Sequence, residues 1–221
     1  MTQADNRRSF TVVATGPFAP GTFHPWWFAH HKLLGEVESK GTDQVLVTPD
    51  ATIFNVAGFD IDVRTNRIQI GTTQENLFEP VRDLMCGVLD VLEGTFIDEL
   101  GINWVEHYST QSEKAWHHVG DTLVPKTMWN KIWPKRAGML NLQVQLERND
   151  DLNGKINLNF QPSNIVKNGI FTSINDHYNL KINDAKVSSA EASEFLRKHW
   201  TSSKETAEKL FKELYEHTNA T

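Results

Sequence analysis

The fold is decided by the stretch FDIDVRTNRIQI (Phe59–Ile70), where apolar and polar residues alternate strictly on both sides of a turn. Thr65-Asn66 provides that turn. An alternation with a period of two places apolar side chains on one face of a strand and polar side chains on the other. The stretch therefore predicts paired strands in a sheet with one buried face and one solvated face.

The segments around this hairpin complete a first α+β unit, residues 10–99. Phe10–Thr15 is predicted to be a strand, and a helix is expected from Pro25 to about Glu38. Gln44–Thr48 and Thr52–Val56 are two further candidate strands. After the hairpin, one apolar stripe at helical spacing predicts a long helix: Val81, Leu84, Met85, Val88, Leu89 and Leu92.

The same order of elements recurs in residues 100–221. Strands are predicted at Asn103–Tyr108 and Gly169–Tyr178, with a short helix at Glu113–His118 after the first of them. Between these lie two alternating stretches, Leu140–Glu147 and Ile156–Gln161, and the Asn153-Gly154 pair that joins them is a strong hairpin signal.

The C-terminal tail is predicted to be helical. Ser188 with Glu191, and Ser202 with Glu205, each match a capping box, which marks a helix start. We therefore expect two helices, or one helix broken near Thr201.

These patterns together predict an α+β fold with two tandem βαβββα-like halves, residues 10–99 and 100–221. The halves are expected to share a mainly antiparallel sheet with helices packed on one face, in one compact unit. Residues 1–9 are expected to be a flexible N-terminus.

Net charge, cysteine content and the length of apolar runs exclude several classes of function. The 221 residues carry a net charge of -6, which argues against general nucleic-acid binding or an anionic-membrane surface. The one cysteine, Cys86, excludes an intramolecular disulfide and falls on an apolar helix face, so we interpret it as a packed thiol. No apolar run is long enough for a membrane span, and we expect a cytoplasmic protein.

Five polar side chains of the second half are candidates for catalysis. If the strand at Asn103–Tyr108 lies beside the one at Gly169–Tyr178, Asn103 would approach Asn175, and histidines would gather near them. Histidine and aspartate are the groups that an acid–base or metal site needs. Local turns and strand ends explain the same residues without any chemistry. The candidates are His107, His117, Asp121, Asp176 and His177.

Four tryptophans are candidates for partner binding: Trp26, Trp27, Trp129 and Trp133. Trp26 and Trp27 are adjacent at a helix start, so both cannot face the same core. Tryptophan is favoured at interface anchors because it joins a large apolar area to one polar group. Ordinary packing of the helix on its sheet is the alternative.

Several short runs resemble a family of uncharacterised bacterial proteins of similar length. They are Pro25-Trp26-Trp27-Phe28-Ala29, Leu100-Gly101-Ile102-Asn103, Trp116 to Asp121 with Leu123 to Lys126 and Trp129, and Gly169-Ile170-Phe171 with Asn175 to Tyr178. The resemblance covers about Phe10 to Tyr178. It implies a bacterial cytoplasmic protein of one domain-length unit, and it brings no activity or catalytic residue with it.

The leading functional hypothesis is a non-enzymatic interaction or assembly subunit of a bacterial multi-protein system, for example a defence system, with another protein or a second copy as partner. It rests on the seven tryptophans and on the absence of recognised catalytic motifs from the sequence. The alternatives are a metal-dependent hydrolase or nuclease-like enzyme that uses the five polar candidates, and a sensor that holds a small ligand between the halves against Trp116. No cofactor or metal is assigned.

Overall fold

One nine-stranded antiparallel sheet runs through the protein in the order β2-β3-β4-β5-β1-β7-β10-β9-β8. The structure is a computed structural model that describes residues 6–36, 45–110, 112–181 and 186–219. The strands of this sheet are β1 (Arg7–Thr15), β2 (Val45–Val47), β3 (Ala51–Val56), β4 (Phe59–Arg64), β5 (Arg67–Thr72), β7 (Glu99–Ser109), β8 (Leu142–Glu147), β9 (Gly154–Pro162) and β10 (Gly169–Asn179).

The strand order confirms the arrangement in two halves. In each half the first strand lies at the centre of the sheet, and the last, third and second strands follow outwards. The two central strands, β1 and β7, pair antiparallel from Arg7↔His107 to Thr15↔Glu99. The sheet is therefore continuous across the boundary between the halves, and β2 adds one short strand at the outer edge of the first half.

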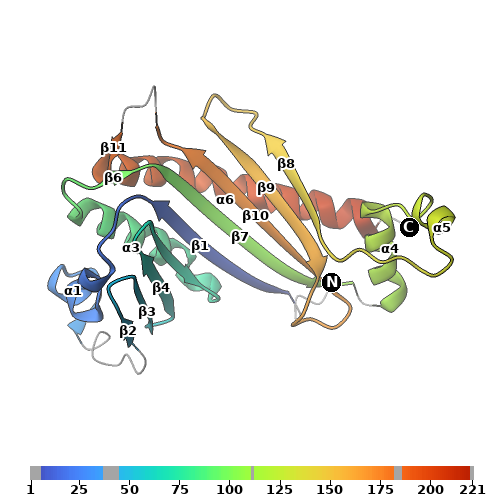
Figure 1. Ribbon diagram of the computed structural model, residues 1–221, viewed down its shortest axis with the longest axis horizontal. Helices are drawn as coiled ribbons and strands as arrows, with labels where there is room; N and C mark the ends of the chain where they lie inside the picture. Colours follow the sequence, from blue (N-terminus) through green and yellow to red (C-terminus); the bar gives the residue numbers. More distant parts are fainter. Residues whose placement is uncertain (1–5, 37–44, 111, 182–185, 220–221) are drawn as a thin grey trace.

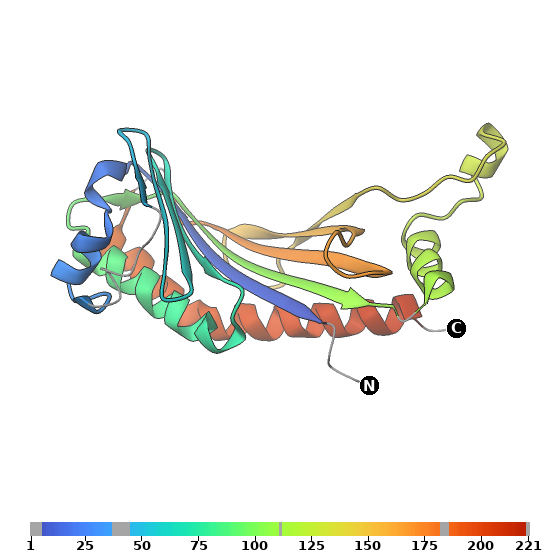
Figure 2. The same ribbon diagram turned by 90° about the horizontal axis from the view of Figure 1, so that it is seen from below.

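Two long helices cover one face of this sheet, as Figure 2 shows. The helix α3 closes the first half and α6 closes the second, so each takes the same place in its half. In the part of the chain that the structure describes, no helix covers the opposite face of the sheet, which we call the open face. The helices are α1 (Pro25–His30), α3 (Phe78–Val91), α4 (Glu113–Leu123), α5 (Trp129–Ile132) and α6 (Ser189–Asn219), with 3₁₀ turns at Pro20–Thr22 and Glu75–Leu77. A two-stranded sheet joins β6 (Phe96–Ile97) to β11 (Val187–Ser188).

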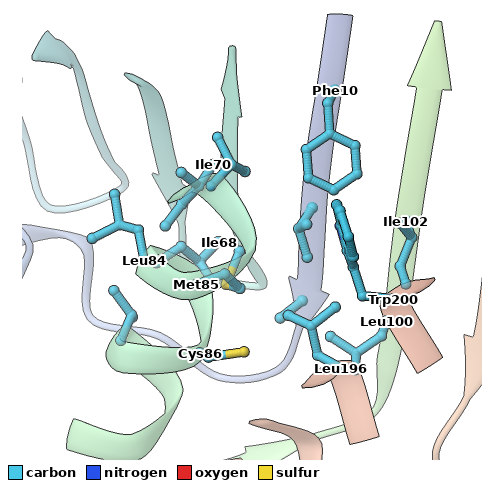
Figure 3. Close-up of a cluster of buried hydrophobic side chains, with 14 of the residues drawn as sticks. Phe10, Ile68, Ile70, Leu84, Met85, Cys86, Leu100, Ile102, Leu196 and Trp200 are labelled. Carbon is cyan, nitrogen blue, oxygen red and sulfur yellow. The ribbon is translucent and has the colours of Figure 1, made fainter. Parts of the chain in front are cut away.

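The hydrophobic core lies between the sheet and the two long helices. Each fully buried aliphatic or aromatic side chain there stabilises the fold by about 1.5–3 kcal/mol. Side chains of β1, β5, β7, α3 and α6 meet in this layer in Figure 3: Phe10, Ile68, Ile70, Leu84, Met85, Cys86, Leu100, Ile102, Leu196 and Trp200.

Cys86 is a packed thiol of this core, as its place on the apolar stripe predicts. It is buried, its Sγ contacts the Ser193 carbonyl oxygen at 3.7 Å, and burial raises the pKa of the thiol. A second contact joins the same two residues, because the Ser193 hydroxyl donates a hydrogen bond to the Cys86 carbonyl oxygen at 3.1 Å. Arg197 adds an ion pair to Asp90 at 2.6 Å on the rim of the same α3–α6 contact.

The predicted hairpin at Phe59–Ile70 is present, with Arg64 opposite Arg67 across the Thr65-Asn66 turn. A second tight hairpin joins β3 to β4 through Ala57 and Gly58. Both residues have a positive φ, 50° and 85°, as a two-residue turn of the primed type requires.

The hairpin of β8 and β9 is also present, but Asn153-Gly154 is not its two-residue turn. Glu147 pairs with Lys155, so a longer loop over residues 148–153 joins the strands, and Gly154 is the first residue of β9. A Cβ atom on Gly154 would lie 2.0 Å from the His177 carbonyl oxygen of β10. The glycine therefore permits a close approach of two backbones rather than a turn.

Two helix predictions were wrong. The first helix ends at His30, not near Glu38, because Lys32 takes a positive φ of 58° that stops it; residues 37–44 lie outside the described part of the chain. The tail is one continuous helix through Thr201. Ser202 does not cap a helix start there, since its hydroxyl donates back to the His199 carbonyl. The capping box at Ser188 and Glu191 is confirmed, with the Ser188 amide donating to the carboxylate at 2.8 Å.

The helix α6 runs beneath both halves, along the long axis of the molecule (Figure 1). Its first part packs on α3, and its later part lies beside β7, where the Trp104 indole donates to the Ser203 hydroxyl at 3.2 Å and Tyr215 contacts Tyr108. Among the described residues, no helix is both long enough and apolar enough to cross a bilayer.

Candidate functional site

The predicted neighbourhood of β7 and β10 is confirmed. Asn103 lies directly opposite Asn175, and the Asn175 amide donates to the Asn103 side-chain oxygen at 2.6 Å. Both side chains belong to the open face, because Trp104 and Ile174, their neighbours along the strands, are buried against the helices. The open face of the second half is therefore polar at its centre.

The Asn103–Asn175 contact is part of a longer row of amides across four strands. Asn157 of β9 donates to Asn175 at 3.0 Å, and Gln145 of β8 donates to Asn157 at 2.9 Å. At the other end, Asn103 donates to the Thr11 carbonyl of β1 at 3.3 Å. We did not expect Asn157 and Gln145 to take part. The alternating pattern of each strand places these amides on the polar face. The strand register that brings them opposite one another is known only from the fold.

His107 lies on the open face of β7, near one end of the sheet. Its Nδ1 lies 2.9 Å from the Ser163 hydroxyl oxygen, and its ring stacks edge-on against Phe171. Partial burial, with the nearby positive charge of Arg7, lowers the pKa of His107 below its ordinary value. The neutral imidazole is therefore the favoured form, held by a serine and an aromatic ring.

His177 lies on the same face but far along the sheet. It is opposite Gly101, whereas His107 is opposite Phe171, so six strand positions separate the two histidines. At about 3.4 Å per residue this is roughly 20 Å. The side-chain neighbour of His177 is Glu99, with His177 Nε2 at 4.0 Å from the carboxylate oxygen. One small substrate cannot contact both imidazoles.

Asp176 points to the opposite face, into the layer between the sheet and α6. Its carboxylate accepts a hydrogen bond from the Tyr178 hydroxyl at 2.5 Å and another from the Arg148 guanidinium. Arg148 lies over the Tyr178 ring at 4.2 Å and binds Asp150 through two hydrogen bonds of 2.7 Å. Asp176 is therefore a member of a buried ion-pair cluster.

The electrostatics of this cluster match a structural role. Burial disfavours the charged form of Arg148, but the hydrogen bonds to Asp150 and Asp176 outweigh burial and raise its pKa. The hydrogen bond from Arg148 lowers the pKa of Asp150. Burial, followed by the charge of Asp176, raises the pKa of Tyr178. The pKa values of Arg148, Asp150 and Tyr178 are all shifted away from neutral pH, so none of these three groups is suited to exchange a proton there.

His117 and Asp121 share one face of α4, as their spacing predicts, and line a cavity of about 190 Å³. His117 is 3.6 Å from Glu113 one turn earlier, and Asp121 is 3.6 Å from Lys126. Trp116 lines the same cavity and donates its indole hydrogen to the Gly169 carbonyl at 3.0 Å. Trp116 therefore lies at the far end of the second half and not between the two halves, where the sensor hypothesis placed it.

The five polar candidates thus occupy four separate places. His107 and His177 lie at two ends of the open face, Asp176 lies under the sheet, and only His117 and Asp121 share a cavity. In the described ranges, no three histidine, cysteine or acidic side chains come close enough together to hold a metal ion. The neighbourhood of β7 and β10 was correctly predicted, but a distributed row of amides occupies it.

The first pair of tryptophans divides between core and surface. Trp27 packs against the core, with its ring 5.0 Å from Phe23, 5.1 Å from Phe28 and 4.6 Å from His31. Trp26 is 58% exposed. Of this pair, only Trp26 presents its indole as an accessible anchor.

The second pair lies on a segment that projects from the body. We define the arm as residues 124–141, the connection from α4 to β8 that includes α5. Figure 2 shows it extending away from the sheet and from α6. Its apolar side chains are largely exposed: Met128, Trp129 (43%), Ile132 (65%), Trp133 (63%) and Leu140 (86%).

The arm also differs from the rest of the chain in charge. It contains Lys126, Lys131, Lys135 and Arg136 and no acidic residue, whereas the whole chain has a net charge of -6. The arm is therefore a basic and aromatic surface on an otherwise acidic protein.

No protein-family model matches the chain, and a search of curated proteins finds no significant match.

Proposed function

We propose that this protein is a non-enzymatic interaction or assembly subunit of a multi-protein system, and that the arm is its contact surface. The observation that carries the proposal is the exposure of Trp129, Ile132 and Trp133 on a segment that projects from the body. Contiguous exposed apolar side chains on a folded domain are typical of interaction sites. Tryptophan in particular supplies the anchors that contribute most to binding free energy.

The charge of the arm indicates the chemistry of the partner. Three basic side chains of the arm are exposed, Lys131, Lys135 and Arg136, whereas Lys126 is paired with Asp121. Complementary charge accelerates association and excludes wrong partners. We therefore expect an acidic protein surface with an apolar pocket for an indole ring.

The enzyme hypothesis has weaker geometric support. It needs His107, His177 and the α4 pair within reach of one substrate, and the histidines on the sheet alone are separated by roughly 20 Å. The ion pair of Asp176 with Arg148 and the hydrogen bond from Tyr178 give that residue a structural role, so it is not a free acid.

The test is a double substitution in the arm, Trp129→Ala with Trp133→Ala. Affinity-tagged protein purified from its own host should lose its co-purifying partner, while the melting temperature stays close to that of the wild type because both indoles are exposed. Trp26→Ala is the matched control, since it removes an exposed indole at the other end of the molecule, and it should retain the partner.

Two results would contradict the proposal. The first is retention of the partner by the arm double variant together with its loss in Trp26→Ala, which would move the contact surface to α1. The second is a large loss of stability in the arm variant with association unchanged.

A further inference from the structure

The strand β8 at the outer edge of the second half is an unprotected sheet edge. Among the described residues it pairs only with β9, so its other side presents unpaired backbone amides and carbonyls. Natural edge strands are usually blocked by lysine, proline, a bulge or a covering segment. β8 contains neither lysine nor proline, its one charge is Glu147 at its last position, and Val144 at its centre is 37% exposed.

The first five residues of β8 form a palindrome: Leu142-Gln143-Val144-Gln145-Leu146. In an antiparallel pair, residues directly opposite each other lie on the same face of the sheet. When two copies of this strand pair about a twofold axis through Val144, each leucine faces a leucine, each glutamine faces a glutamine, and Val144 faces Val144 of the second copy. This edge is therefore complementary to itself.

We propose that two copies of this chain associate by pairing β8 with β8 about a twofold axis at Val144. This inference goes beyond the role proposed for the arm and stands on a different surface. A twofold interface uses the same patch on both subunits, which is what a self-complementary strand provides.

Both faces of the joined sheet support the pairing. On the helix side, Leu142, Val144 and Leu146 are only partly covered in the single chain, and they would bury one another across the axis. On the open side, Gln145 is the outermost member of the amide row and would lie opposite Gln143 of the second copy. The polar row of each subunit then meets a matching amide.

The matching of opposite side chains favours this register over its neighbours. Pairing about Val144 places Glu147 opposite Asn141 of the second copy, so no two like charges face each other. Shifting the axis to Gln145 would set Val144 against Leu146 and Glu147 against Gln143, and the matched pairs would be lost. A one-residue slip between the strands would place apolar side chains opposite polar ones.

The mass of the wild-type protein in solution is the first measurement. Sedimentation velocity should show a dimer of the 25.2 kDa chain that dissociates on dilution. Val144→Lys places two lysines opposite each other at the axis and should reduce the species to the monomer, with an unchanged circular dichroism spectrum. Val47→Lys makes the same change on β2, the other edge of the sheet, and should leave the dimer intact.

The register is tested by disulfide trapping. Residues opposite each other in antiparallel strands have Cα atoms about 4.5–5.5 Å apart, within the range of a disulfide. Val144→Cys should therefore form a covalent dimer under mild oxidation. Gln145→Cys alone should not, since the two copies of residue 145 are diagonal neighbours about 7–8 Å apart. A mixture of Gln143→Cys and Gln145→Cys chains should cross-link. Cys86 is buried and gives little background.

A wild-type protein that remains monomeric up to its highest soluble concentration would overturn the proposal. So would a dimer that survives Val144→Lys but dissociates with Val47→Lys. Dimerisation is also separable from the arm: the Trp129→Ala and Trp133→Ala double variant should remain dimeric, so loss of the dimer there would assign self-association to the arm instead.

Discussion

At the scale of single residues, Arg148 is the side chain that balances the buried charge of Asp176. Its guanidinium and the Asp176 carboxylate are both nearly inaccessible to water. Removing one partner of a buried ion pair leaves an uncompensated charge and costs about 3–5 kcal/mol. Arg148→Met should therefore lower the free energy of unfolding, measured in urea, by about 3 kcal/mol.

Asp150→Asn is the control for this prediction, because it removes the exposed partner of the same arginine, and exposed ion pairs contribute about 1 kcal/mol or less. The double variant Arg148→Met with Asp176→Asn should lose less stability than the sum of the two single variants, since the unpaired charge is then absent. An Arg148→Met variant with stability close to that of the wild type would show that Tyr178 alone can satisfy Asp176.

At the scale of elements, the contact of β9 with β10 depends on a glycine. A Cβ atom at position 154 would collide with a backbone carbonyl that cannot move without disturbing β10. Gly154→Ala should therefore lower the free energy of unfolding by about 2 kcal/mol or more. Gly21→Ala, where a Cβ atom meets nothing within 4 Å, should have little effect. Equal stabilities of the two variants would contradict the importance of the close approach.

Sequence patterns predicted the elements well where the signal was periodic. The alternation of Phe59–Ile70 and the stripe of α3 predicted buried faces that the structure confirms. Short local signals for turns and helix starts were less reliable. Gly154 serves the packing of two strands rather than a turn, and Ser202 lies inside α6 although it matches a capping box. Tertiary contacts, which no local pattern contains, decided both cases.

At the scale of the whole molecule, His199 on α6 links stability to pH. Its ring packs against Phe195 at 4.3 Å beside the Arg148 cluster, and burial, with the charge of Lys198, lowers its pKa below the ordinary 6.5. His107 is shifted in the same direction. The unfolded chain then binds protons more readily than the folded one, so the stabilisation is complete above about pH 6.5 and decreases as the pH falls.

The melting temperature should accordingly decrease between about pH 7 and about pH 5, and His199→Gln should flatten that decrease because glutamine does not titrate. An equally steep decrease in His199→Gln would exclude this histidine as the source. The measurement needs only thermal denaturation followed by circular dichroism.

At this scale, the sequence predicted which strands of the candidate site are neighbours but not how its side chains are distributed. The neighbourhood of Asn103 and Asn175 was a hypothesis that depended on the two strands being adjacent, and the structure confirms it. The gathering of histidines there did not occur, because His107 and His177 occupy distant positions of a long strand pair. The exposure of Trp133 and the partial burial of Trp27 depend on which segments cover them, and that is a property of the finished fold.

The single helix beneath both halves has a consequence for the order in which the protein can fold during synthesis. The core of the first half is completed by Leu196 and Trp200, and the contact of Cys86 with Ser193 closes a separation of 107 residues. At a translation rate of about 5–20 residues per second, β1 to α3 emerge roughly 5–20 s before the segment that covers them. During that interval α6 is not yet there to cover the apolar face of the early half, so the first half can complete its core only after the end of the chain has been synthesised.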